Sequence, residues 1–293
     1  MNRIGRREFL QRGGALAMAG MAAGPWLRRA GAAEAKPKFK LGLCTYNVAA
    51  GWDLATILEN CRQAQFEGVE FRTTHKHGVE PALSAEQRRD VKQRCADAGV
   101  LVWGLGTTCE FHSPDPATVK KNIATCGEFV KLAADLGARG VKVRPNGLPK
   151  EVQPEKTLAQ IGAALLECGK AAAAHGVQIW LEVHGAATAE PAHIRAIMDA
   201  CPHPAVGVCW NSNASDVKDG SVKPSFELLK DRIRSCHIND LGSKYPYGEL
   251  FGLFRAGGYD GFTLCEYGKT LPPAEGLEFM KKYRARWMEL AAG

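Results

Sequence analysis

Residues 154–183 read PEKTLAQIGAALLECGKAAAAHGVQIWLEV, and this stretch is one complete helix-then-strand unit. Apolar side chains recur every three or four residues over 154–175, which predicts a helix with one buried face. The stripe consists of Leu158, Ile161, Leu165 and Cys168. Gly176 is typical of a residue that ends a helix. The apolar run 177–183 then predicts a strand buried on both faces, as in parallel sheets.

The same unit recurs along the chain at intervals of about thirty residues. Strands are predicted over 41–46, 68–71, 100–105, 141–143, 177–183, 206–210, 233–238 and 262–265. Helices are predicted over 53–66, 86–98, 116–136, 154–175, 190–200, 226–229, 247–256 and 274–290. Alternating strands and helices indicate a parallel sheet. Roughly 250 residues suit a closed (β/α)8 TIM barrel, so we predict a single barrel domain over 36–293.

A doubly wound open sheet is the main alternative for such an alternation. That fold usually carries a glycine-rich nucleotide-binding turn after its first strand. Here the corresponding turn, 46–52, reads YNVAAGW and has no G-x-G-x-x-G pattern. The sequence therefore favours the barrel.

The first 35 residues have the pattern of an export signal. Arg6 and Arg7 precede an uncharged stretch over 13–27, and small-residue cleavage sites follow at 30–32 and 33–35. Paired arginines, a mild apolar run and a small-x-small site are typical of a twin-arginine signal. The run is too short for a stable membrane span. We therefore predict a periplasmic or otherwise exported protein with a signal peptide over 1–35.

Charge argues against nucleic acid as a partner. The chain carries a formal net charge of +7, and the predicted signal holds six Arg and two Glu, which leaves only +3 for the rest. That balance is too small to indicate a nucleic-acid-binding surface. The chain also has ten cysteines with no C-x-x-C pair. An even count in an exported protein suggests disulfides, but cysteines scattered through strands and helices are more typical of small buried residues.

Polar residues at the carboxyl ends of barrel strands are where TIM barrels place their chemistry. Glu182, Asn211, His237 and Glu266 end four successive predicted strands, so we expect them to converge on one side of the mouth. Oxygen ligands with one imidazole suit one divalent ion such as Mn²⁺, Mg²⁺, Co²⁺ or Zn²⁺. The prediction is a metal site with open positions for substrate oxygens.

These segments resemble a known family in their order. LEVH at 181–184, CWNSN at 209–213, SCHIND at 235–240 and LCEY at 264–267 look like the metal-ligand segments of the sugar phosphate isomerase/epimerase branch of the xylose isomerase-like superfamily. GYDG at 258–261 is also similar to that branch. The resemblance runs from residue 40 to the last helix, and its specificity lies in the ordered set.

The resemblance implies a metal-dependent isomerase or epimerase that abstracts a proton next to a carbonyl of a sugar. Glu182 and Glu266 would each bind metal and handle the proton, one removing it and the other returning it on the opposite face. One departure is clear: the family usually has aspartate where Asn211 stands and histidine where Ala214 stands. The neutral Asn211 weakens the expected metal binding, and the missing histidine disfavours the multi-zinc nuclease branch.

Further polar residues near the strand ends are candidates for binding the hydroxyl groups of a small carbohydrate substrate. The candidates are His75, Glu110, His112, Arg144, His184, Asn213 and Asp240. Trp52 and Tyr245 could stack on a sugar ring. Because no glycine-rich phosphate cradle occurs in the last two loops, a free sugar or a keto-sugar derivative is favoured over a sugar phosphate.

Two alternatives stay open at this point. The same proton abstraction could end in elimination, which would make the protein a lyase or dehydratase. A non-catalytic carbohydrate-binding barrel is the other, suggested by the change to Asn211. The sequence is compatible with a homo-oligomer and does not identify the sugar.

Overall fold

The computed structural model describes residues 37–293, and the predicted export signal lies outside the described residues. The strands are β1 (Lys40–Cys44), β2 (Gly68–Arg72), β3 (Leu101–Glu110), β4 (Gly140–Arg144), β5 (Gln178–Glu182), β6 (Val206–Trp210), β7 (Ile233–Ile238) and β8 (Phe262–Cys265). All neighbours pair in parallel, and β8 pairs with β1, which closes the sheet into a barrel. The predicted (β/α)8 TIM barrel is confirmed.

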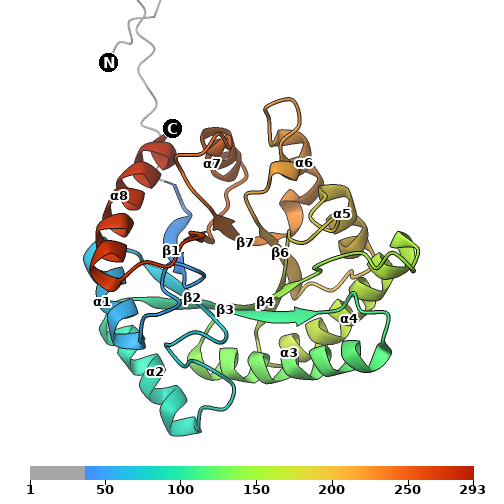
Figure 1. The fold of residues 1–293 in the computed structure, drawn as a ribbon, viewed down its shortest axis with the longest axis horizontal. Helices are drawn as coiled ribbons and strands as arrows, with labels where there is room; N and C mark the ends of the chain where they lie inside the picture. Colours follow the sequence, from blue (N-terminus) through green and yellow to red (C-terminus); the bar gives the residue numbers. More distant parts are fainter. Residues whose placement is uncertain (1–36) are drawn as a thin grey trace, which may run out of the picture. The chain divides into compact units, whose positions relative to one another are not determined.

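The helices surround the strands (Figure 1). They are α1 (Leu54–Ala64), α2 (Ala85–Asp97), α3 (Pro116–Leu136), α4 (Pro154–Ala174), α5 (Pro191–Asp199), α6 (Lys223–Leu229), α7 (Tyr247–Ala256) and α8 (Pro273–Ala292). Short 3₁₀ turns occupy Ala214–Asp216 and Lys230–Arg232. The apolar stripe that predicted α4 lies buried: Leu158, Ile161, Leu165 and Cys168. Within residues 37–293, no helix is both long and apolar enough to cross a membrane.

Aromatic side chains fill the amino-terminal end of the barrel. Trp103 and Trp180 stack with ring centroids 5.3 Å apart, and Phe262 lies 4.9 Å from Trp103. Gly140 makes room for Trp180, since a Cβ there would lie 2.3 Å from the indole. The carboxyl ends of the strands carry the polar residues instead, so the barrel has one apolar end and one polar end.

Two expectations from the sequence need correction. β3 runs to Glu110, five residues past its predicted end at 105, because the threonines after Gly106 continue the strand and Thr107 hydrogen-bonds the Lys142 carbonyl oxygen at 2.8 Å. Trp52 is 1% exposed and packs where Gly276 leaves space, and its indole nitrogen donates to the Leu271 carbonyl oxygen at 2.8 Å. Trp52 is therefore part of the packing and no platform for a sugar.

All ten cysteines lie among the described residues, and each is buried and unpaired. They behave as small apolar residues of the interior, as their scattered positions indicate.

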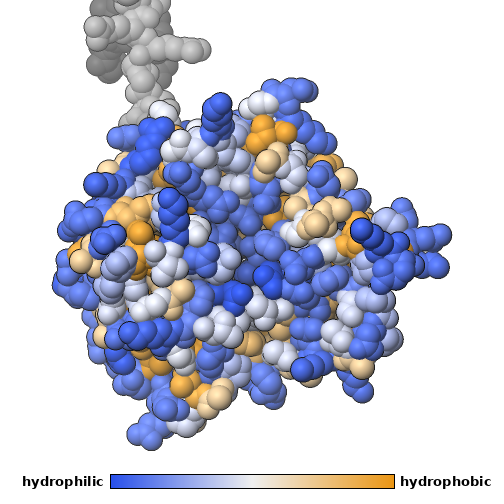
Figure 2. Space-filling model, viewed as in Figure 1, coloured by the Kyte–Doolittle hydropathy of each residue, from blue (hydrophilic) through white to orange (hydrophobic). Residues whose placement is uncertain are grey.

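Hydrophilic residues predominate on the molecular face drawn in Figure 2, and the apolar residues there are scattered.

Candidate active site

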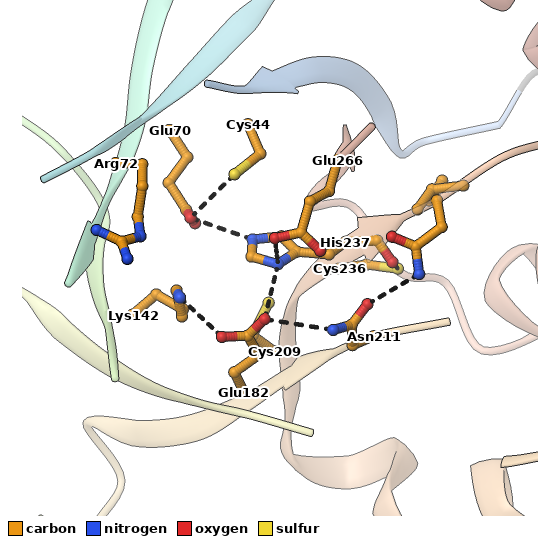
Figure 3. A network of polar contacts seen from close by, with 12 residues as sticks. Cys44, Glu70, Arg72, Lys142, Glu182, Cys209, Asn211, Cys236, His237 and Glu266 are labelled. Atoms are coloured by element: carbon orange, nitrogen blue, oxygen red, sulfur yellow. Dashed lines mark hydrogen bonds and ion pairs between the residues drawn. The ribbon is translucent and has the colours of Figure 1, made fainter. Parts of the chain in front are cut away.

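Three of the four predicted metal ligands converge inside the barrel mouth. Glu182 ends β5, His237 lies in β7, and Glu266 follows β8. His237 Nδ1 lies 3.4 Å from Glu182 Oε1 and 3.3 Å from Glu266 Oε1. Figure 3 shows both carboxylates directed at this nitrogen. His237 is completely buried, whereas the Glu266 side chain keeps 12% exposure, so the group is reached from the side of Glu266.

Glu70 in β2 contacts the other ring nitrogen of the His237 imidazole. His237 Nε2 lies 3.1 Å from Glu70 Oε1, and both side chains are fully buried. With the Nε2 hydrogen donated to Glu70, the Nδ1 lone pair points at the two carboxylates. Nδ1 is buried and has no hydrogen-bond partner. A histidine whose other nitrogen bonds a carboxylate is the usual arrangement behind a bound metal ion.

The donor set therefore fits a divalent cation. Three electron-pair donors face one another, and atoms about 2.0–2.2 Å from one ion lie roughly 3 to 3.6 Å apart. The two measured separations, 3.4 and 3.3 Å, fall in that range. When no ion is bound, burial opposes a charged His237, but Cys209, Glu266 and Glu70 around it outweigh burial and raise its pKa well above the usual value. Either a proton or a cation is needed between these donors.

Asn211 is placed next to this group but turned differently from a metal ligand. Its side-chain nitrogen lies 3.3 Å from Glu182 Oε1. Its oxygen accepts from the Ser212 backbone at 2.9 Å and from Asn239 at 3.4 Å. Turning the amide over would set its NH₂ group against the Ser212 N–H. In this arrangement Asn211 positions Glu182, and its role as a ligand stays a prediction.

Lys142 is a buried cation inside the site. It lies in β4, its side chain is 4% exposed, and Nζ is 2.7 Å from Glu182 Oε2. Burial alone would lower the lysine pKa, but Glu182 and Glu70 raise it. Burial alone would raise the pKa of Glu182, yet Lys142 and His237 hold it well below its usual value. Glu182 is therefore an ionised carboxylate fixed by Lys142 and Asn211.

Cys44 at the end of β1 completes the wall beside Glu70. Its Sγ donates to Glu70 Oε1 at 3.7 Å, and burial raises the pKa of its thiol well above the usual value. Donor atoms of Cys44, His237 and Glu266 lie within 4.8 Å of one another. Because Cys44 contacts the oxygen that holds His237 Nε2, it lies on the far side of the imidazole from Glu182.

The predicted substrate contacts on β3 and β4 form one cluster at the rim. Arg144 pairs with Glu110, and Asn146 donates to the same carboxylate oxygen at 2.8 Å. His112 Nδ1 lies 4.0 Å from the other Glu110 oxygen. His112 Nδ1, Arg144 Nε and His184 Nδ1 are buried and lack hydrogen-bond partners. Such atoms are costly to leave unpaired, so these three nitrogens are unsatisfied hydrogen-bonding groups of the rim cluster.

The other predicted substrate contacts divide into two groups. His75 accompanies the site, hydrogen-bonded to Thr45 at 3.2 Å and stacked on Tyr46, and burial lowers its pKa to about 4. Asn213 instead uses its side-chain nitrogen to hold the Val183 carbonyl oxygen at 2.6 Å. Asp240 is exposed and accepts from the Gly242 backbone at 2.9 Å. For Asn213 and Asp240 the structure shows loop-stabilising hydrogen bonds.

Three charged residues of the site were not predicted from the sequence: Glu70, Lys142 and Arg72. Glu70 and Lys142 are charged residues between apolar ones in predicted strands, in Val-Glu-Phe at 69–71 and Val-Lys-Val at 141–143, and Arg72 directly follows the predicted strand 68–71. Alternate residues of a barrel strand point inward, so a charge at such a position faces the barrel interior. A charged residue flanked by apolar ones within a predicted strand is therefore the sequence signal for Glu70 and Lys142.

Asp216 in the 3₁₀ turn after β6 gives a testable dependence of stability on pH. Burial raises its pKa to about 7, against hydrogen bonds from Asn213 and Tyr245 that lower it. Because the folded pKa exceeds the unfolded one, stability is full below pH 4 and lost as pH rises to about 7. We expect a loss of up to about 4 kcal/mol, measured by urea unfolding between pH 4 and 8. Asp216→Asn should flatten this dependence, whereas the exposed Asp260→Asn should leave it. A wild-type slope that persists in Asp216→Asn would contradict the assignment.

The closed parallel barrel, with carboxylates and a histidine at its carboxyl-terminal mouth, places the chain in the class of TIM barrels. A family model described as xylose isomerase-like TIM barrel matches residues 58–283. The chain therefore belongs to the xylose isomerase-like TIM barrel family, as the ordered strand-end segments indicated.

Solved structures with the same fold include enzymes of several activities. The 3-keto-D-glucoside 4-epimerase of E. coli is 14% identical, with a TM-score of 0.70 over 86% of this chain and 99% of that one. A probable 3-DHS dehydratase of Bacillus anthracis is 15% identical, with a TM-score of 0.68 over 84% and 99%. The IOLI protein with a bound zinc atom is 16% identical, with a TM-score of 0.73 over 87% and 98%. A search of curated proteins gave no match. These identities establish the fold alone.

Proposed function

We propose that this protein is a divalent-metal-dependent isomerase or epimerase of a free sugar or keto-sugar derivative. The observation that carries the proposal is the unpartnered His237 Nδ1, which faces Glu182 and Glu266 at 3.4 and 3.3 Å. Glu182, His237 and Glu266 would hold the ion, with Asn211 as the fourth predicted ligand. A bound ion would polarise a substrate carbonyl and lower the cost of removing the adjacent proton.

The two glutamates have different surroundings, and we assign them different parts in proton transfer. Glu182 is fixed by Lys142 and Asn211, which keeps its carboxylate ionised, the form that can accept a proton. Glu266 is the more exposed of the two and has no hydrogen bond to a neutral group among the described residues. Its exposed side would allow the carboxylate to take up a proton from solvent and return it to the opposite face of the planar intermediate. Inversion at one carbon needs such a pair of groups.

Elimination is the second candidate, because the same proton abstraction precedes it. The similarity in fold to a probable dehydratase favours keeping it. The products separate the two: an epimer has the mass of the substrate, whereas elimination releases water or an aglycone. A product lighter by one water would replace the epimerase proposal with the lyase.

Metal content tests the site directly. We expect the protein to retain close to one equivalent of Mn, Co, Zn or Mg after the excess is removed, and His237→Ala to lose it. The measurement is inductively coupled plasma mass spectrometry on both proteins, each first incubated with one metal at a time. His203→Ala is the matched control, since His203 lies before β6 and away from the mouth. Equal metal content in wild type and His237→Ala would refute the proposed site.

A further inference from the structure

Two layers of charged side chains line the β2–β4 side of the mouth. Glu70 in β2 and Lys142 in β4 form the deeper layer, and Arg72 and Arg144 follow two residues later on the same strands. Residues two apart on a strand point to the same face, so the arginines lie one step nearer the mouth. The proposed metal ligands occupy the opposite side, on β5 to β8.

Gly106 on the intervening strand β3 keeps this side open. It pairs with both Arg72 and Lys142 in the sheet register. A Cβ at Gly106 would lie 2.8 Å from Glu70 Oε1 and 3.4 Å from Arg72 Cδ. The missing side chain gives the space into which Glu70 and Arg72 lean, and Figure 3 shows Arg72 and Lys142 on the same side of the site.

Arg72 is the unneutralised cation of this group. Lys142 pairs with Glu182, and Arg144 pairs with Glu110. Among residues 37–293, no carboxylate lies within ion-pair distance of Arg72, whose only side-chain hydrogen bond goes from Nη1 to the Thr73 carbonyl oxygen at 2.8 Å. Its guanidinium lies 5.7 Å from the centre of the Tyr46 ring, a cation–π contact that restrains it. Arg72 is half-buried, so part of its side chain remains accessible.

The summed charge of the two layers and the proposed metal ligands also identifies Arg72 as the cation without a partner. Four carboxylates (Glu70, Glu110, Glu182 and Glu266) face three cations (Arg72, Lys142 and Arg144). A divalent ion would therefore leave one positive charge over, and Arg72 is the group that carries it. An arginine with free donors binds carboxylates through two parallel hydrogen bonds.

We propose that the substrate is a keto-sugar acid whose carboxylate binds Arg72 while its carbonyl end faces Glu182 and Glu266. This inference rests on the proposed function and names the substrate class of the same site. A carboxylate supplies the single negative charge that the balance requires, whereas a phosphate group carries nearly two. The carbonyl and the carboxylate belong to opposite ends of one short chain, as Arg72 and the ligand set lie on opposite sides of the mouth.

Three probes that share carbons 1 to 5 test the proposal: D-fructose, D-fructuronate and D-fructose 6-phosphate. Binding to the metal-incubated protein is measured by calorimetry, separately from exchange of substrate hydrogen with D₂O. We expect D-fructuronate to bind tightest and Arg72→Gln to weaken it about 10- to 100-fold, the range for one lost hydrogen bond between charged groups. The affinity for D-fructose, which has no carboxylate to pair with Arg72, should change less than about threefold. Arg72→Lys should restore part of the loss, and the exposed Arg286→Gln should lose nothing.

The outcomes separate this inference from the proposed function. Equal binding of D-fructose and D-fructuronate by the wild type, or an equal loss for both in Arg72→Gln, would overturn the inference even if exchange occurs. Tighter, Arg72-dependent binding of D-fructose 6-phosphate than of D-fructuronate would overturn the carboxylate in favour of a phosphate. Arg72-dependent binding of D-fructuronate without exchange would support the inference while removing the proposed catalysis.

Discussion

Replacing Glu266 by glutamine should lower turnover by about 10²- to 10⁴-fold, the usual contribution of a positioned acid–base group. The glutamine amide has nearly the shape of the carboxylate but cannot give a proton to the substrate. Glu266 keeps 12% exposure, and within residues 37–293 its only ion pair is with His237, so the fold should tolerate the change. Formation of the epimer in D₂O, followed by NMR together with exchange of the substrate α-hydrogen, measures the effect on the chemical step.

The matched control is Glu275→Gln, which removes an exposed carboxylate at the start of α8. It should leave the exchange rate unchanged. Thermal unfolding of both variants would show that the barrel is intact. Sugar binding with full strength but no exchange in any variant, wild type included, would instead favour the carbohydrate-binding barrel.

The second large effect is expected at Lys142. Lys142→Met leaves the buried Glu182 carboxylate without its cation, and breaking one partner of a buried pair typically costs about 3–5 kcal/mol. The free energy of unfolding in urea should fall by that amount. Because the ammonium also keeps the pKa of Glu182 low, the carboxylate should become harder to ionise, and activity near neutral pH should fall with stability.

A double variant separates the two effects. Lys142→Met with Glu182→Gln removes both charges, so most of the lost stability should return, whereas exchange should be abolished because the base is gone. The exposed pair Lys281–Glu278 in α8 serves as the comparison, since surface pairs contribute at most about 1 kcal/mol. A Lys142→Met protein as stable as wild type would show that Glu182 finds another partner or is neutral.

The barrel could be predicted from the sequence because its signals are local. Apolar residues repeat about every 3.6 residues in α4, and a continuous apolar run marks the strand after it. The same unit recurs along the chain. The candidate ligands could be predicted as well, because a parallel barrel brings the ends of successive strands together. The convergence of Glu182, His237 and Glu266 follows from their order and from the strand ends. Their role as metal ligands stays a prediction.

The remaining parts of the site depend on side-chain placement that no local pattern specifies. Whether Lys142 reaches Glu182 is decided by the register of β4 against β5. The orientation of Asn211 depends on its contacts with Ser212 and Asn239. The export signal and the domain boundary near residue 36 stay predictions. The sequence therefore indicated which strands carry the site, while the deeper layer of charge required coordinates.

The burial of every cysteine gives this protein a built-in reporter of its own opening. A folded barrel presents no accessible thiol in residues 37–293, whereas a chain that opens presents up to ten. The rate of maleimide labelling under native conditions would then report how often the folded protein opens. Cys61 and Cys95 sit in α1 and α2, and Cys209 and Cys236 in β6 and β7. The order in which they are modified would distinguish loosening of the outer helices from separation of the strands.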